Sequence, residues 1–197
     1  MRYFRVMMAM AVTVLGLAGC LRQPDRVGVS VSARRAKADL LGLHIDRVVP
    51  MAGARAEWDL DKQLTAYLEV MAARGAASDQ DPVIHGQVTG HLVSGELGLN
   101  YFPWPTRALG LELGLETNYA AYDIQGGWGP VQVELADKLL GVGLNLGLTG
   151  EVPLTRDRRW RFFWGAGYHL TETSADRARI DLDGWYGQVG LKISLDP

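Results

Sequence analysis

Cysteine is almost absent from this sequence, because Cys20 is the only one among 197 residues. A lone thiol cannot form an intramolecular disulfide, so the fold must be stabilised by packing or by lipid. An excess of charge is also missing, since the formal net charge is −2 and the pI is about 6.1. That balance gives no electrostatic reason to expect a nucleic-acid partner. After residue 20 no apolar run reaches the length of a membrane helix.

The first twenty residues have the organisation of an export signal. The basic segment Met1–Arg5 precedes an apolar run from Val6 to Leu17, and small residues lead up to Cys20. A basic start, a short apolar run and small residues are the features of a cleaved signal peptide. The apolar run is too short to span a membrane by itself.

The four residues at the end of this signal resemble the lipobox of bacterial lipoproteins. They read Leu17-Ala18-Gly19-Cys20. The resemblance implies that the signal is cut before Cys20 and that the thiol of Cys20 is acylated. In that family an aspartate after the cysteine commonly retains the protein in the inner membrane. Leu21 stands there instead, which favours the outer membrane.

The segment from Leu139 to Thr149 alternates strictly between apolar and small or polar residues. Leucine or valine occupies every even position from 140 to 148, whereas the odd positions hold glycine, asparagine or threonine. This period of two predicts a strand with one apolar face, because a helix would scatter the same residues around its circumference. At roughly 3.3 Å per residue, the apolar face spans about 30 Å, which matches the hydrocarbon thickness of a bilayer when tilted.

The same alternation recurs along the chain. Strands are expected over residues 27–33, 52–58, 64–72, 93–101, 109–122, 131–149, 160–170 and 185–195. Loops are expected over 75–82 and 126–130, a change of phase near Asp137 suggests a β-bulge or a break, and Asp183-Gly184 is typical of a hairpin turn. Residues 38–49 fit either an extended hairpin or a short helix or packed loop. The prediction is an antiparallel up-and-down β-barrel of about eight strands, over residues 27–197, after a signal peptide (1–19) and a lipidated tether (20–26).

The face opposite the apolar residues decides which side is inside. It carries many glycines and small polar residues together with charged ones, which we expect to form a charge network in the lumen: Arg55, Glu57, Glu69, Glu96, Glu112, Glu116, Arg161 and Lys192. In a narrow barrel small residues leave room and opposite charges pair. Eight strands leave an interior that side chains fill, which disfavours an open channel.

Aromatic residues give a second test of this orientation. If the N-terminus is periplasmic and the strands alternate in direction, the aromatic residues gather in two girdles, one at each end of the barrel, as in barrels that cross a bilayer. The expected girdle residues are Trp58, Tyr101, Trp104, Trp128, Trp160 and Trp185.

From residue 52 onward the dyad pattern and the turn lengths resemble the small outer-membrane β-barrels of the OmpA-like class. That resemblance implies an outer-membrane barrel with a structural or surface-interaction role, and the lipobox resemblance implies the lipid anchor. Members of that class usually end in an aromatic residue, whereas this sequence ends in Leu195-Asp196-Pro197. The expected partners are membrane lipid, at the acyl anchor and the barrel exterior, and an envelope protein or surface ligand at the loops.

Two other functions are compatible with the pattern. In the first, a soluble lipid-anchored barrel folds its apolar face around a cavity for a hydrophobic ligand. The second is a lipid A-modifying barrel enzyme, suggested by His169 near Thr171, Glu172 and Ser174. The order of these residues does not reproduce the His-x-Ser motif of that family, and the alternation directs His169 into the lumen, away from lipid.

No cofactor or metal site is predicted. The four histidines, His44, His85, His91 and His169, show no recognised ligand spacing. The segment from Asp181 to Gly184 has only a fragment of a calcium-loop pattern. No catalytic residue is assigned.

Overall fold

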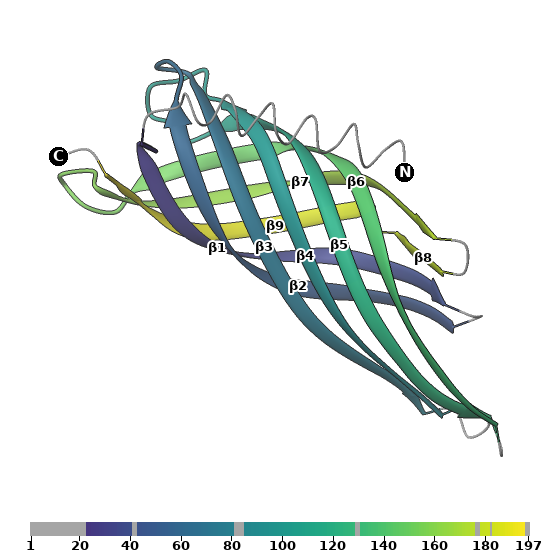
Figure 1. Cartoon of the computed structure of the whole chain (residues 1–197). Coiled ribbons are helices and arrows are strands. Elements are labelled where there is room, and N and C mark those ends of the chain that lie inside the picture. The colour runs from purple at the N-terminus through teal and green to yellow at the C-terminus, as the bar shows by residue number, and fades with distance from the viewer. Residues whose placement is uncertain are drawn as a thin grey trace.

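The computed structural model describes residues 23–40, 43–80, 85–128, 131–175, 178–181 and 183–195. These residues form one antiparallel sheet (Figure 1). Its segments are β1 (Arg26–Leu40), β2 (Leu43–Asp59), β3 (Leu64–Gln80), β4 (His85–Tyr101), β5 (Gly110–Trp128), β6 (Val131–Pro153), β7 (Trp160–Ala175), β8 (Ala178–Asp181) and β9 (Gly184–Ser194). Among the described residues no helix is long and apolar enough to cross a bilayer.

The sheet closes on itself. The first strand, β1, pairs with β2 along one edge and with β8 and β9 along the other. Since β8 and β9 also both pair with β7, they are successive parts of one strand, and the wall contains eight strands. Each strand pairs with the next in the chain, so the predicted antiparallel up-and-down β-barrel is confirmed.

The alternation along each strand separates the two faces of the wall. On β5, Leu111, Leu113 and Leu115 are exposed on the exterior, whereas Glu112 and Glu116 are buried inside. Buried polar residues far outnumber buried hydrophobic ones among the described side chains. The barrel is therefore inverted relative to a soluble protein, with its polar side chains inside and its leucines outside.

Glycines on the inner face make room for large side chains that cross the lumen. A Cβ atom on Gly98 would lie 2.5 Å from the Tyr67 hydroxyl oxygen, and one on Gly147 would lie 2.5 Å from the Tyr186 hydroxyl oxygen. Tyr67 is fully buried and Tyr186 nearly so. Aromatic rings thus fill the interior and pack directly against the backbone of these glycines.

Several strands are longer than the sequence predicts. β3 continues to Gln80 and β5 to Trp128, so neither loop starts where its glycine, serine and aspartate content suggested. The described residues of the segment 38–49 form the extended hairpin, one of the two alternatives, because β1 pairs with β2 as far as Leu40 opposite Leu43. Backbone pairing with neighbouring strands overrides local composition at these positions.

The backbone irregularity lies in the eighth strand and not near Asp137. Pairing between β5 and β6 continues without a break from Trp128 opposite Val131 to Gly110 opposite Thr149, so the predicted bulge or break in β6 is wrong. Asp183-Gly184 is not a hairpin turn either. The register with β1 shifts by two residues there, because Lys37 pairs with Asp181 whereas Arg34 pairs with Tyr186, as a bulge in the eighth strand produces. Gly184 adopts a φ of 152° there, a value that residues with a side chain rarely adopt.

The two ends of the barrel differ. At one end, called here the turn end, short turns over residues 60–63, 102–109 and 154–159 lie beside both described chain ends, where the Leu195 amide donates to the Asp25 carbonyl at 2.9 Å. At the other, called the split end, pairing between β2 and β3 stops at Ala52–Ala72, and pairing between β6 and β7 stops at Gly141–Thr173. Beyond these points β3–β6 curve away from β1, β2 and β8 (Figure 1).

The contact between Tyr67 and bare backbone predicts a difference between two glycines. Gly98→Ala forces a methyl group against Tyr67 and the Leu113 carbonyl, and we expect it to destabilise the barrel by about 1–3 kcal/mol. Gly187→Ala is the control, because a Cβ atom there meets nothing within 4 Å. Urea unfolding of the refolded barrel measures both. Equal midpoints for the two variants would show that the inner face does not need glycine at position 98.

Candidate functional site

The residues predicted for the lumen charge network come together inside the barrel. Arg55 and Glu57 come from β2, Glu69 from β3, Glu96 from β4, Glu112 and Glu116 from β5, Arg161 from β7 and Lys192 from β9. All except Arg161 are buried, with at most 3% of the residue exposed. Charged side chains from six strands thus replace the usual hydrophobic core.

At the turn end the network is centred on Glu57. Its carboxylate accepts hydrogen bonds from Arg26 Nε at 2.9 Å, Arg55 Nε at 2.9 Å and Lys192 Nζ at 2.7 Å. Lys192 also donates to Glu151 at 3.0 Å, and Arg161 donates to Glu151 at 3.1 Å. Each carboxylate in this layer is therefore neutralised by at least two cations, as burial of a charge requires.

The middle layer is built around the Arg55 guanidinium. It donates to Glu69 and Glu112 at 3.3 Å each, and it lies 3.7 Å from the centre of the Tyr67 ring. Neutral donors complete the coordination of these carboxylates. Tyr186 donates to Glu112 at 2.8 Å, and Gln188 donates to Glu69 at 2.5 Å. The cation–π contact adds to the ion pairs in holding Arg55 in place.

The outer layer, nearest the split end, contains Arg34, Glu96, Glu116 and His169. Arg34 Nη1 donates to Glu116, and Arg34 Nη2 lies 3.7 Å from Glu96. The Tyr67 hydroxyl and the Asn145 amide both donate to Glu96. His169 Nδ1 lies 3.0 Å from the second oxygen of Glu116. Two carboxylates share one guanidinium here, so this layer has fewer cations for each carboxylate than the turn end.

Sequence reasoning missed several members of the network: Arg26, Arg34, Asp59, Arg107 and Glu151. Arg26 and Arg34 share the parity of the small residues Gly28, Ser30 and Ser32 on the first strand, which was the available indication of an inward position. The cluster of basic residues around Arg34 suggested a strand end instead.

Side chains fill the interior around Glu57, next to the turn end. The small void bounded by Gly28, Arg55, Glu57 and Phe163 has no room for a water molecule. Phe102, in the turn after β4, is fully buried, and the Arg107 guanidinium lies 5.4 Å from its ring centre. Side chains fill this end of the lumen, as the size of an eight-stranded barrel predicts.

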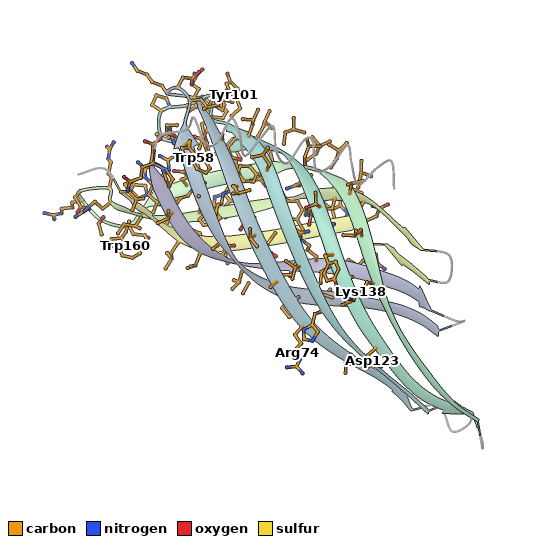
Figure 2. The ribbon with its side chains drawn as sticks, in the orientation of Figure 1. Trp58, Arg74, Tyr101, Asp123, Lys138 and Trp160 are labelled. Atoms are coloured by element: carbon orange, nitrogen blue, oxygen red, sulfur yellow. The ribbon has the colours of Figure 1, made fainter. Side chains whose placement is uncertain are left out.

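Aromatic and charged residues mark two levels on the exterior. Trp58, Tyr101 and Trp160 lie at the turn end, whereas Arg74, Asp123 and Lys138 lie toward the split end (Figure 2). Trp104 lies in the turn between β4 and β5. Trp185, near the start of β9, is 76% exposed and packs edge-to-face on Tyr168 at 5.4 Å between ring centres. The side chain of Trp128 lies outside the described part of the chain.

Comparison with known proteins places the chain by its fold. No family model and no curated protein matches the sequence. The outer membrane protein OprG of Pseudomonas aeruginosa is 11% identical, with 89% of this chain and 98% of that chain covered and a TM-score of 0.53. CarO of Acinetobacter baumannii is 12% identical, with 87% of this chain and 97% of that chain covered and a TM-score of 0.51. Ail, the attachment invasion locus protein of Yersinia pestis, is 10% identical, with 87% of this chain and 99% of that chain covered and a TM-score of 0.50. All three are small outer-membrane eight-stranded barrels. At these identities, the likeness shows the fold alone.

Arg55 bridges two buried carboxylates, Glu69 and Glu112, in the middle layer. We expect Arg55→Met to leave Glu69 and Glu112 without their shared cation and to destabilise the barrel by about 3–5 kcal/mol. The matched control is Arg74→Met on the exposed exterior, which should change the stability by no more than about 0.5 kcal/mol. Urea titration followed by gel mobility reports both values. A loss for Arg55→Met no larger than that for the control would mean that the buried charges do not stabilise the barrel.

Proposed function

We propose that this chain is a lipoprotein of the bacterial outer membrane whose barrel is embedded in the bilayer and whose split end contacts partners at the cell surface. The observation that carries the proposal is the exterior apolar belt, a ring of exposed leucines and valines around the wall. Its most exposed leucines on β5 and β6 are Leu111 at 58%, Leu140 at 55% and Leu115 at 54%. An apolar surface that surrounds the whole molecule favours lipid as its solvent.

The limits of the belt support a bilayer. The outward-facing residues change from apolar to charged between neighbouring positions on the same face of a strand. The change runs from Ala72 to Arg74 on β3 and from Leu140 to Lys138 on β6. At the turn end the belt is bordered by Trp58, Tyr101 and Trp160 (Figure 2). The aromatic residues match one interface of a membrane, and the charged residues mark where the apolar belt ends on the other side.

The two alternative functions have less support. A barrel that encloses a hydrophobic ligand needs an apolar interior, but the described interior is lined by charges, so the prediction that the apolar face could line a cavity is wrong. A lipid-modifying enzyme needs its catalytic histidine at the lipid surface. His169 is 1% exposed and lies inside the wall.

The position of the chain entry supports an acyl anchor at Cys20. The described chain joins the barrel at Asp25, whose amide donates to the Glu57 carbonyl at 2.9 Å at the turn end. Cys20 precedes Asp25 by five residues, a reach of roughly 17 Å at most. An acyl chain on Cys20 would therefore enter the leaflet that borders the turn end. The barrel and the anchor would then insert into the same membrane. This arrangement assigns the turn end to the periplasm and the split end to the outside.

The split end supports a role at the surface. β2, β3 and β6 all continue past the last residues of the belt, in two groups of strands that no longer pair with each other. Strands that leave the bilayer and separate present backbone edges and side chains to the exterior, which are the elements that recognise partners.

Membrane extraction of a Cys20→Ala variant with an ordinary cleavable signal tests the embedded barrel. We expect this variant to stay in the outer-membrane fraction after alkaline carbonate treatment and to change its gel mobility on heating, because the belt alone holds it in lipid. The wild-type chain is the control, and mass spectrometry of its mature N-terminus should find an acylated Cys20. Release of the variant as a soluble folded protein would refute the embedded barrel, and an unmodified wild-type N-terminus would refute the anchor.

A further inference from the structure

Three metal-ligating side chains from three strands converge in the outer layer of the lumen. They are Glu96 on β4, Glu116 on β5 and His169 on β7, and one donor atom from each lies within 4.8 Å of the other two. None of the three is more than 2% exposed. Pairing places Glu96 directly opposite Glu116, so the cluster follows from the strand register. We propose that these three residues bind a divalent transition-metal ion inside the barrel.

The position of His169 is the first support. Its Nδ1 atom lies 3.0 Å from Glu116 Oε2, but the two groups are not aligned as a hydrogen bond. Neither ring nitrogen has a hydrogen-bond partner among the described protein groups. A buried imidazole in that situation is costly, unless a nitrogen lone pair binds something else. Two ligands of one metal, with bonds of about 2.0–2.2 Å at a right angle, lie about 3 Å apart, which matches the observed contact.

The charge balance is the second support. Glu96 and Glu116 have one guanidinium between them, that of Arg34. The hydrogen bond from Arg34 goes to Glu116 Oε1, which leaves Glu116 Oε2 directed at the imidazole. A divalent cation would compensate the surplus negative charge, and Arg34 would orient one carboxylate ligand from outside the coordination sphere. The same guanidinium repels a cation, so the site should bind more weakly than a closed structural site.

Polar side chains continue from the cluster toward the split end. Ser94 and Asn118 face each other on β4 and β5, and Thr171 follows His169 on the same face of β7. All three are at least nine-tenths buried, and their side chains have polar atoms with no hydrogen-bond partner in the described structure. They lie between the cluster and the split end, so the polar lining of the lumen continues past the cluster in that direction.

The donor set selects the class of metal. One imidazole nitrogen and two carboxylate oxygens suit Zn²⁺, Co²⁺ or Ni²⁺, whereas Ca²⁺ and Mg²⁺ prefer oxygen ligands throughout. The site contains no thiolate, which disfavours copper(I). Co²⁺ is the useful probe, because its visible absorption reports coordination directly.

The test is a Co²⁺ titration of the untagged full chain, folded in detergent, with Zn²⁺ as the competitor. We expect one saturable site with visible absorption that Zn²⁺ abolishes. Glu116→Gln and His169→Ala should each weaken binding at least tenfold. The control is the triple variant His44→Ala, His85→Ala and His91→Ala, which keeps His169 as the sole histidine and should bind like the wild type.

Two results of the titration would overturn the proposal. Absence of saturable binding to the wild type, or loss of binding in the triple variant, would exclude this site. If Glu116→Gln and His169→Ala fail to fold, X-ray absorption of the Zn²⁺-loaded wild type decides the matter, since it must show one imidazole with oxygen ligands. Folding in detergent is judged by heat-dependent gel mobility, so a negative metal result leaves the proposed membrane location unaffected.

Discussion

Closure of the sheet is the constraint on which the rest of the structure depends. In the proposed membrane location, a strand that crosses hydrocarbon has no water to bind its N–H and C=O groups, so each strand must pair on both sides. The ladder between β1 and β9, from Arg26–Ser194 to Arg34–Tyr186, meets that requirement. Once the sheet is closed, every side chain points either outward or into a narrow lumen. Leucines outside and carboxylates inside are the two consequences of one alternation.

The narrow lumen also explains how so many charges are tolerated. A buried carboxylate must be paired and hydrogen-bonded, and the inner glycines leave space for the long arginine, lysine and tyrosine side chains that do this. Glu57 is surrounded by three cations, whereas Glu96 and Glu116 share Arg34. The charge balance therefore changes along the barrel axis, from a compensated turn end to an outer layer with surplus negative charge. That gradient is the basis for placing a metal ion beside His169.

The strands were predictable because a period of two is a local property, and the inward charges followed from the same parity. The segment 140–148 is the clearest case. Features that depend on pairing with a neighbouring strand were not predictable. β3 continues to Gln80 through residues of loop composition because β4 pairs with it. Asp183-Gly184 has the composition of a hairpin turn, yet β8 before it and β9 after it both pair with β1 and β7, so the chain continues in the same strand. The meeting of Glu96, Glu116 and His169 needs the register of β4, β5 and β7, which no local pattern contains.

The most direct test of the outward apolar face is the accessibility of a spin label in lipid vesicles. Since Cys20 is the only cysteine, a Cys20→Ala background allows a single label at Leu144 on the belt or at Lys138 beyond it. The label at position 144 should collide with oxygen, which concentrates in lipid, and be shielded from a water-soluble nickel chelate. The label at position 138 should show the reverse. A label at 144 that the nickel chelate reaches as readily as one at 138 would contradict an embedded barrel.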